Sequence, residues 1–160
     1  VLNYADTESL GKGTESFTDP NFTNFLAKTS DIAEEIEQSL HMKLISGGSE
    51  DPDKNGTYTI YRMQVENPSK YAKAYSKLIE TQEEAGNIVG SYGLRQHVGG
   101  SVNYYTHYAY TSAGSMEEAM KSAEALYSSD SFAKFSKEVS GNRKTMNISI
   151  LSNVKTYNAN

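Results

Sequence analysis

The chain has 160 residues, enough for one domain with a sizeable core or for two small repeats. It carries 15 basic and 20 acidic residues and no basic stripe, which argues against nucleic acid as a main partner. No apolar run approaches the roughly 18 residues of a membrane-spanning helix, so we expect no transmembrane segment. The absence of cysteine excludes disulfides and thiolate chemistry.

The compartment stays open at this level. The chain begins at Val1 rather than at methionine, which favours either a processed export signal or a fragment of a longer protein. Abundant Asn, Ser, Thr and Tyr fit a periplasmic or secreted protein slightly better than a cytoplasmic one.

Residues 1–46 are predicted to form a strand, a helix and a second strand. Leu2–Ala5 reads as a short strand, and residues 7–18, which contain two glycines and no periodicity, read as a loop. Asp19 and Pro20 predict a helix start, because the aspartate accepts from free amides and proline fits the first helical position. Apolar residues follow at helical spacing: Phe22, Phe25, Leu26, Thr29, Ile32 or Ala33, Ile36 and Leu40.

Two details of this first part bear on its boundaries. A second cap at Ser30 or Asp31 would divide the helix into two. Met42–Ile45 is predicted to be the second strand, and residues 47–56 form a polar, turn-rich linker.

The part after the linker shows clearer periodicity. Thr57–Glu66 alternates like a strand, and Asn67 with Pro68 begins a helix that ends at Gly86. The buried stripe of this helix is Tyr71, Ala74, Tyr75, Leu78 and Ile79. The stretch Ile88–Thr111 is predicted to be a β-hairpin with its tight turn at Gly99-Gly100-Ser101, because glycine takes the positive φ that such a turn needs.

Two further helical segments and a strand complete the chain. Ser115 and Glu118 form a predicted capping box. The stripe of the helix that it opens is Met116, Ala119, Met120, Ala123 and Tyr127. Asp130 caps a further helix that carries Phe132, Phe135 and Val139 and stops at Gly141-Asn142. Lys144–Val154 is the last strand, with Met146, Ile148 and Ile150 on one face.

The order of elements from Thr57 onward is β-α-β-β-α-β, which predicts an α+β fold of the ferredoxin-like type. Residues 57–160 would form one complete repeat, and residues 1–46 would match the second half of the same unit. Leu2-Asn3-Tyr4 corresponds to Val102-Asn103-Tyr104, and the paired phenylalanines after Pro20 correspond to Phe132 and Phe135. One and a half repeats would then form, or contribute to, an α/β barrel, with the first strands in a second, related sheet.

This layout and its paired-phenylalanine helix resemble the dimeric α/β-barrel superfamily, which includes antibiotic-biosynthesis-type monooxygenases, stress-responsive barrel proteins and haem-binding two-repeat enzymes. The resemblance implies two sheets that close face to face, by self-association or by tandem repeat, around a cavity. Because the activities in this group vary widely, the resemblance implies no particular function.

Strand alternation separates two faces of the sheet. The side chains expected to face the helices are Tyr61, Met63, Val65, Tyr92, Leu94, Val98, Met146, Ile148 and Ile150. The opposite, polar face is expected to hold Ile60, Arg62, Gln64, Ser91, Arg95, His97, Asn147, Ser149 and Leu151. On the third strand we expect Val102, Tyr104, Tyr108 and Tyr110 to point inward, with Asn103, Tyr105 and His107 on the polar face. The predicted ligand site on that face is Arg62, Arg95, His97, Tyr105 and His107, a set that suits a small anionic or carbonyl-bearing molecule.

The sequence contains only a weak candidate for a metal site. Asp51, Asp53 and Asn55 match the first half of a calcium loop, but Arg62 stands where a bidentate acid is needed, which favours an ordinary acidic turn. The three histidines lack the spacing of a zinc site. A single histidine suffices to bind haem, so no cofactor is assigned.

Two classes of function remain open. The first is a non-catalytic binding or self-assembling protein that uses the polar sheet face as an interface or ligand site. The alternative is a small barrel enzyme, monooxygenase-like or haem-binding, that uses His97 or His107 with an arginine. A pocket with convergent polar groups would favour the enzyme, and a flat covered face would favour assembly.

Overall fold

The computed structural model describes residues 4–30, 32, 39–101 and 104–154. They divide into two compact units, Val1–Glu37 and Gln38–Asn160. Within the described residues, no helix is long and apolar enough to cross a membrane.

The first unit consists of short helices. These are α1 (Thr7–Glu15), the 3₁₀ helix η1 (Ser16–Thr18) and α2 (Pro20–Thr29). Asp19 caps α2 by accepting a hydrogen bond of 2.7 Å from the amide of Asn21, which confirms the predicted start. The phenylalanines of this unit contact one another, with the rings of Phe17 and Phe22 stacked at 5.2 Å, yet none of its helical residues is buried.

The predicted loop over residues 7–18 is wrong. Asp6 caps α1 by accepting from the amide of Ser9 at 2.8 Å, and Lys12 pairs with Glu8 one turn away at 2.7 Å. These local interactions outweigh the low helix propensity of Gly11 and Gly13. The predicted first strand is not found at its described residues, Tyr4 and Ala5, whereas Leu2 and Asn3 lie outside them.

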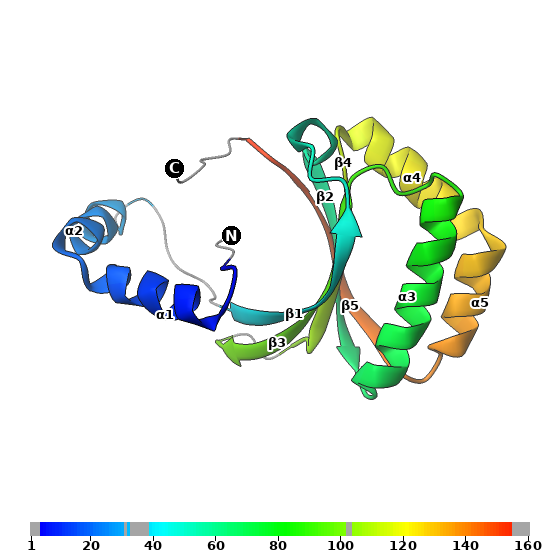
Figure 1. The fold of residues 1–160 in the computed structure, drawn as a ribbon, viewed down its shortest axis with the longest axis horizontal. Helices are drawn as coiled ribbons and strands as arrows, with labels where there is room; N and C mark the ends of the chain where they lie inside the picture. The colour runs from blue at the N-terminus through cyan, green and yellow to red at the C-terminus, as the bar shows by residue number, and fades with distance from the viewer. Residues whose placement is uncertain (1–3, 31, 33–38, 102–103, 155–160) are drawn as a thin grey trace. The chain divides into compact units, whose positions relative to one another are not determined.

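The second unit is built on five antiparallel strands in the order β1-β3-β4-β2-β5 (Figure 1). The strands are β1 (Ser39–Gly48), β2 (Thr57–Val65), β3 (Ser91–Gly100), β4 (His107–Ala113) and β5 (Arg143–Ser152). The helices are η2 (Pro52–Lys54), α3 (Pro68–Glu84), α4 (Met116–Ser128) and α5 (Asp130–Glu138). The predicted β-α-β-β-α-β order is therefore confirmed, and β2 pairs with β5 as that order requires.

Strand β1 corrects two predictions about the first part of the chain. The predicted strand Met42–Ile45 lies in β1, which pairs with β3 at the edge of the same sheet rather than in a second one. Leu40 belongs to β1 and not to a helix, whereas the predicted helical positions Ala33 and Ile36 lie outside the described residues. The sheet is open, with β1 and β5 at its two ends, and the internal repeat stays a prediction.

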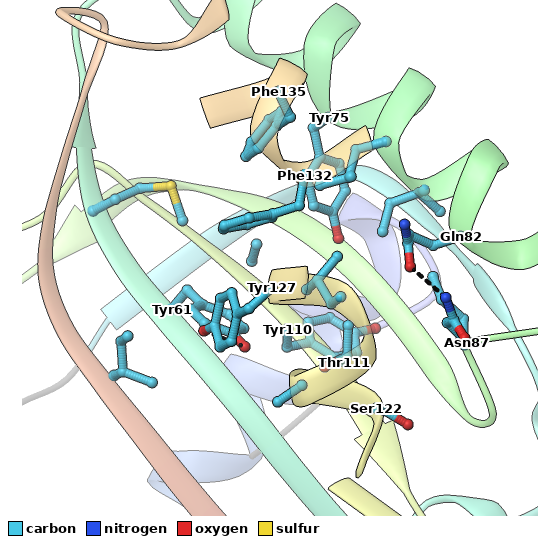
Figure 2. A pocket seen from close by; sticks show the side chains of 18 of the residues that line it. Tyr61, Tyr75, Gln82, Asn87, Tyr110, Thr111, Ser122, Tyr127, Phe132 and Phe135 are labelled. Carbon is cyan, nitrogen blue, oxygen red and sulfur yellow. Dashed lines mark hydrogen bonds between the residues drawn. The ribbon is translucent and has the colours of Figure 1, made fainter. Parts of the chain in front are cut away.

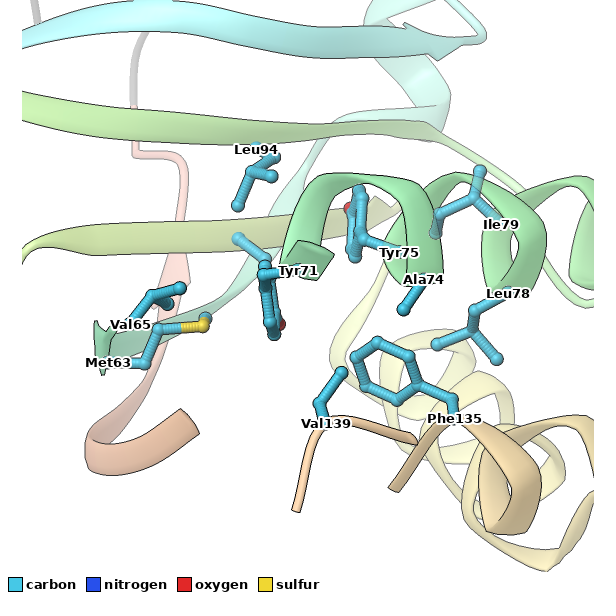
Figure 3. Close-up of a cluster of buried hydrophobic side chains, with 11 residues drawn as sticks. Met63, Val65, Tyr71, Ala74, Tyr75, Leu78, Ile79, Leu94, Phe135 and Val139 are labelled. Carbon is cyan, nitrogen blue, oxygen red and sulfur yellow. The ribbon is translucent and has the colours of Figure 1, made fainter. Parts of the chain in front are cut away.

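The core lies between the sheet and α3, α4 and α5, which all cover one of its faces (Figure 1). All five residues of the predicted α3 stripe are buried, and they meet Leu94, Met63 and Phe135 (Figure 3). In α4 the predicted stripe is largely wrong, because Ala119 is buried but Met116, Met120 and Tyr127 are about half exposed. The helix begins as predicted, with Ser115 accepting from the amide of Glu118.

The hairpin is present, but its tight turn is not. The β3–β4 ladder stops at the pair Gln96–His107, and the connection continues through Thr106. Gly99 and Gly100 extend β3 instead, where they pair with Leu40 and Ser39 of β1. The two glycines therefore belong to the β1–β3 ladder at the edge of the sheet. The sequence did not indicate this pairing, because β1 was expected in a second sheet.

Candidate functional site

The face of the sheet opposite α3, α4 and α5 is called the open face here, because within the described residues of this unit no α-helix covers it (Figure 1). Leu94 and Met63 point into the core, so their neighbours Arg95 and Arg62 point to the open face. A row of register pairs crosses this face. It runs Lys43, Arg95, Tyr108, Arg62, Asn147.

Both arginines are held by neutral oxygens. Arg62 donates to Asn147 Oδ1 at 3.2 Å and to Ser149 Oγ at 3.0 Å. Arg95 donates to the carbonyl of Ile45 at 2.8 Å and to the hydroxyl of Tyr110 at 3.2 Å. In the part of the chain that the structure describes, neither guanidinium forms an ion pair with a carboxylate. Their positive charges therefore remain uncompensated at this face.

Four aromatic side chains gather beside the two arginines: His41, His97, Tyr105 and Tyr108. The ring of His41 lies 5.4 Å from His97 and 4.7 Å from Tyr108, and its Nε2 is hydrogen-bonded to the hydroxyl of Tyr105 at 2.9 Å. Arg62 lies 5.8 Å from the centre of the Tyr105 ring. We call these six residues, Arg62 and Arg95 with the four rings, the open-face cluster.

The electrostatics of the open-face cluster disfavour a further positive charge. The pKa of His41 is lowered to about 4, first because burial penalises its charged form and then because of electrostatic repulsion from His97, Arg62 and Arg95. His41 is therefore neutral at pH 7, and the same field favours an anion. His97 Nε2 is buried and has no hydrogen-bond partner among the described residues.

The structure brings together Arg62, Arg95, His97 and Tyr105 as expected, but His107 does not join them. His107 pairs with Met63 and Gln96, on the helix side of the sheet, where it is almost fully buried. Its Nδ1 is bonded to Thr106 Oγ1 at 2.9 Å, and burial lowers its pKa. The predicted alternation of the third strand is therefore wrong at His107, because the connection after β3 is longer than a tight turn. Val102 and Asn103 lie outside the described residues.

The predicted faces of the tyrosines in β4 are wrong for the same reason. Tyr108 and Tyr110 lie on the open face, in register with Arg95 and Gly93, rather than inward. His41 was missed altogether, although its alternation with the strand Met42–Ile45 was visible in the sequence. The pairing of β1 with β3 was needed to place His41 opposite His97.

A second candidate site lies on the other side of the sheet, under α4. It is a cavity of about 160 Å³ between the sheet and the helices, lined mainly by apolar and aromatic side chains (Figure 2). Two polar pairs line it. Tyr127 donates to the hydroxyl of Tyr61 at 3.1 Å, and Asn87 donates to Gln82 at 2.9 Å. Burial and the bond to Tyr127 raise the pKa of Tyr61, so its hydroxyl stays protonated.

This cavity is the size that takes a single benzene ring. No histidine is among its described lining residues, so the residues present do not fit a histidine-ligated haem. Sequence reasoning missed the cavity, because it depends on how few large side chains α4 inserts into the core.

The calcium-loop residues lie in and beside η2, where they serve the turn. Asp51 caps η2 by accepting from the amide of Asp53 at 3.0 Å. Asn55 Oδ1 accepts from the amide of Ser91 at 3.0 Å and from the hydroxyl of Ser112, which ties the loop to the sheet. Asn55 Oδ1, one of the oxygens that the predicted calcium loop would offer to a cation, therefore already accepts two hydrogen bonds.

Comparisons with known proteins support the fold. No protein-family model and no curated protein sequence matches this chain. Several solved structures are similar to it in fold. A putative monooxygenase from Fusobacterium nucleatum superposes with a TM-score of 0.54 at 14% identity, covering 92% of this chain and 64% of its own. A putative monooxygenase from Lactobacillus acidophilus gives 0.53 at 11% identity, covering 88% and 62%.

A third structure, of an anthrone oxidase-like protein, superposes with a TM-score of 0.51 at 14% identity over 96% of this chain and 72% of its own. The present chain thus spans less than two thirds of the length of both monooxygenases. At these identities the likeness concerns the fold alone, and it supports the predicted ferredoxin-like α+β fold.

The first testable prediction concerns the space beneath Arg95. A Cβ at Gly93 would lie 2.6 Å from the ring of Tyr110 and 2.8 Å from Arg95 Nη1. We expect Gly93→Ala to displace both side chains and to lower the unfolding free energy by about 1–3 kcal/mol in chemical denaturation. Gly99→Ala, where a Cβ meets nothing within 4 Å, is the matched control and should change it by less than about 0.5 kcal/mol. Equal effects of the two substitutions would contradict the packing described.

The second prediction follows from the histidines. A folded-state pKa near 4 for His41, against 6.5 when unfolded, means that the unfolded chain binds more protons between these values. The unfolding free energy should therefore be highest above about pH 7 and fall as the pH drops from 6.5 toward 4, with His107 adding in the same direction. His41 alone should account for on the order of 2 kcal/mol, allowing for solvent screening.

The measurement is urea unfolding at several pH values. The double variant His41→Gln, His107→Gln should flatten the slope in this window. A variant with the slope of the unmodified protein would refute the assignment.

Proposed function

We propose that this protein binds a small, planar, anionic molecule on the open face of its sheet. The observation that carries the proposal is the pair Arg62 and Arg95, two arginines in register on either side of Tyr108 with no carboxylate partner in the described structure. Charge-assisted hydrogen bonds from arginine to a carboxylate are among the strongest that proteins use.

The arrangement favours an aromatic anion over a simple inorganic one. Arg62 and Arg95 both stand in register with Tyr108, one on each side of it, so an anion over this ring meets both charges. The rings of Tyr108 and His41 offer apolar faces for stacking. Each donor group of Arg95 that now bonds to a neutral oxygen has a weaker partner than a carboxylate would be.

Binding is favoured over simple face-to-face assembly as the use of this surface. The resemblance implies that two sheets could close face to face over this surface. Tyr105, the tyrosine expected on the polar face, is only 4% exposed within a single chain and packs edge-on against Tyr104 at 4.9 Å. This ring needs no second sheet to cover it, and closure of two open faces stays a prediction.

The test uses benzoate as the anionic probe and benzamide as its neutral counterpart, with binding followed by nuclear magnetic resonance shifts. We expect benzoate to bind more tightly than benzamide. Arg95→Gln and Arg62→Gln should each weaken benzoate binding about tenfold, since one charged hydrogen bond contributes roughly 1.5–3 kcal/mol. Higher salt should weaken it further.

Lys121→Gln is the matched control, because Lys121 is an exposed cation of α4, on the helix side. It should leave benzoate binding unchanged. Equal binding of benzoate and benzamide, or normal benzoate binding by both arginine variants, would overturn the proposal.

A second candidate function is a small enzyme that acts on a compact aromatic molecule in the cavity under α4. The specific observation in its favour is a partly open, mainly apolar space with the hydroxyls of Tyr61 and Tyr127 in its wall. The fold is shared with proteins described as putative monooxygenases and as anthrone oxidase-like, which makes oxidation the reaction class to examine.

Filling the cavity tests this candidate. Toluene should raise the melting temperature of the unmodified protein, and Ala123→Leu should remove that effect because Ala123 lines the cavity. Ala125→Leu, on the same helix but outside the lining, is the control. Oxygen uptake with hydroquinone, above the rate without protein and lost in Ala123→Leu, would support the enzyme. If toluene does not stabilise the protein and hydroquinone causes no oxygen uptake, the enzyme candidate is excluded.

A further inference from the structure

Strand β5 forms one end of the sheet, and in the described structure only β2 pairs with it. Its outer edge therefore presents a row of backbone amides and carbonyls that a further strand could meet. Soluble proteins commonly protect such edges with inward charges, prolines or a covering loop. From Thr145 to Ser152 the strand contains no charged residue and no proline.

The edge is also apolar on both sides. Ile148 and Ile150 are 52% and 40% exposed on the helix side, and Leu151 is 49% exposed on the open side. The patch continues onto α4. Ile148 pairs with Tyr61, whose hydroxyl bonds to the half-exposed Tyr127. A continuous apolar rim along an unpaired strand edge is typical of an interaction surface.

The two ends of β5 differ in charge. Arg143 and Lys144 begin the strand. At its far end the amide of Asn153 donates to the carbonyl of Gly56 at 2.7 Å, which brings β5 beside the loop that carries Glu50, Asp51 and Asp53. Consider a partner strand that runs antiparallel to β5 and carries the same charges. Its basic end would lie at the acidic loop of this chain, and its acidic loop would lie at the basic end of β5 in this chain. A second copy of the chain meets this condition twice, once at each end.

The register follows from the irregularity in β5. The pairing with β2 shifts between Arg62 and Met63, which leaves Met146 bulged and the regular part of β5 after it. An antiparallel pair of identical strands centred on Ser149 places Ile148 opposite Ile150 of the other copy. Both side chains are exposed and lie on the same side of the sheet. Cross-strand pairs of β-branched residues stabilise such a ladder.

We propose that two copies of this chain associate edge to edge through β5, antiparallel about a two-fold axis at Ser149, into one continuous sheet. The axis is perpendicular to the sheet, so the helices of both copies lie on one side and both open faces lie on the other. The interface leaves the open-face cluster uncovered, and it does not depend on the proposed ligand.

The absence of cysteine allows a direct test by single-cysteine crosslinking of the full chain. In an antiparallel pair the residue on the axis faces its own copy with Cα atoms about 4.5–5.5 Å apart, within the range of a disulfide. We expect Ser149→Cys to form a disulfide-linked dimer under mild oxidation. Lys144→Cys, far from the axis, should not. Crosslinking at both positions would indicate parallel pairing and overturn the proposal.

Sedimentation of the cysteine-free chain supplies a second, independent readout. The average mass should rise toward that of a dimer as concentration increases, and Ile150→Lys should hold the protein monomeric at the same concentrations. Met42→Lys, at a similarly exposed position of the opposite edge strand, is the matched control and should still dimerise.

Two results would refute the edge interface. They are a strict monomer at all concentrations and a dimer that survives Ile150→Lys. If that surviving dimer is lost in Arg62→Gln, closure of the open faces is indicated instead.

Discussion

The packing of α3 against the sheet fixes the chemistry of both sheet faces. Leu94 is fully buried and Met63 nearly so, because both lie under the stripe of Tyr71 and Tyr75. Strand side chains alternate, so burying these two residues sends Arg95 and Arg62 to the opposite side. A change that moved either strand by one residue would place a guanidinium in the core, where an unpaired charge is very costly.

Much of the fold was predictable because local and long-range signals agree there. In α3, an N-cap at Asn67, a proline at the first position and a regular apolar stripe all indicate the same helix, and the structure confirms each. The strand pair β2–β5 was predictable from alternation and element order. The prediction was wrong where these signals conflict. In α1, two glycines favoured a loop, although the segment forms a helix capped by Asp6.

The site was predictable only in part, for a geometric reason. Arg62, Arg95 and His97 lie on strands whose alternation is anchored by buried neighbours, so their face could be deduced. His107 and Tyr108 lie after a connection of unknown length, and an error of one residue there exchanges the two faces. His41 required knowledge of which strand pairs with β1, a long-range contact that no local pattern specifies.

Helix α4 is less firmly anchored on the sheet than α3. Ala119 is its buried residue, whereas α3 buries six, and the cavity separates part of α4 from the sheet. Local opening costs less free energy where less apolar surface is buried, so the amides of α4 should exchange with solvent through partial unfolding, well before those of α3. Such breathing gives small apolar molecules a route into the protein interior while the strands stay paired. The sheet and α3 then act as a stable frame, and α4 is the part of the structure that can move aside.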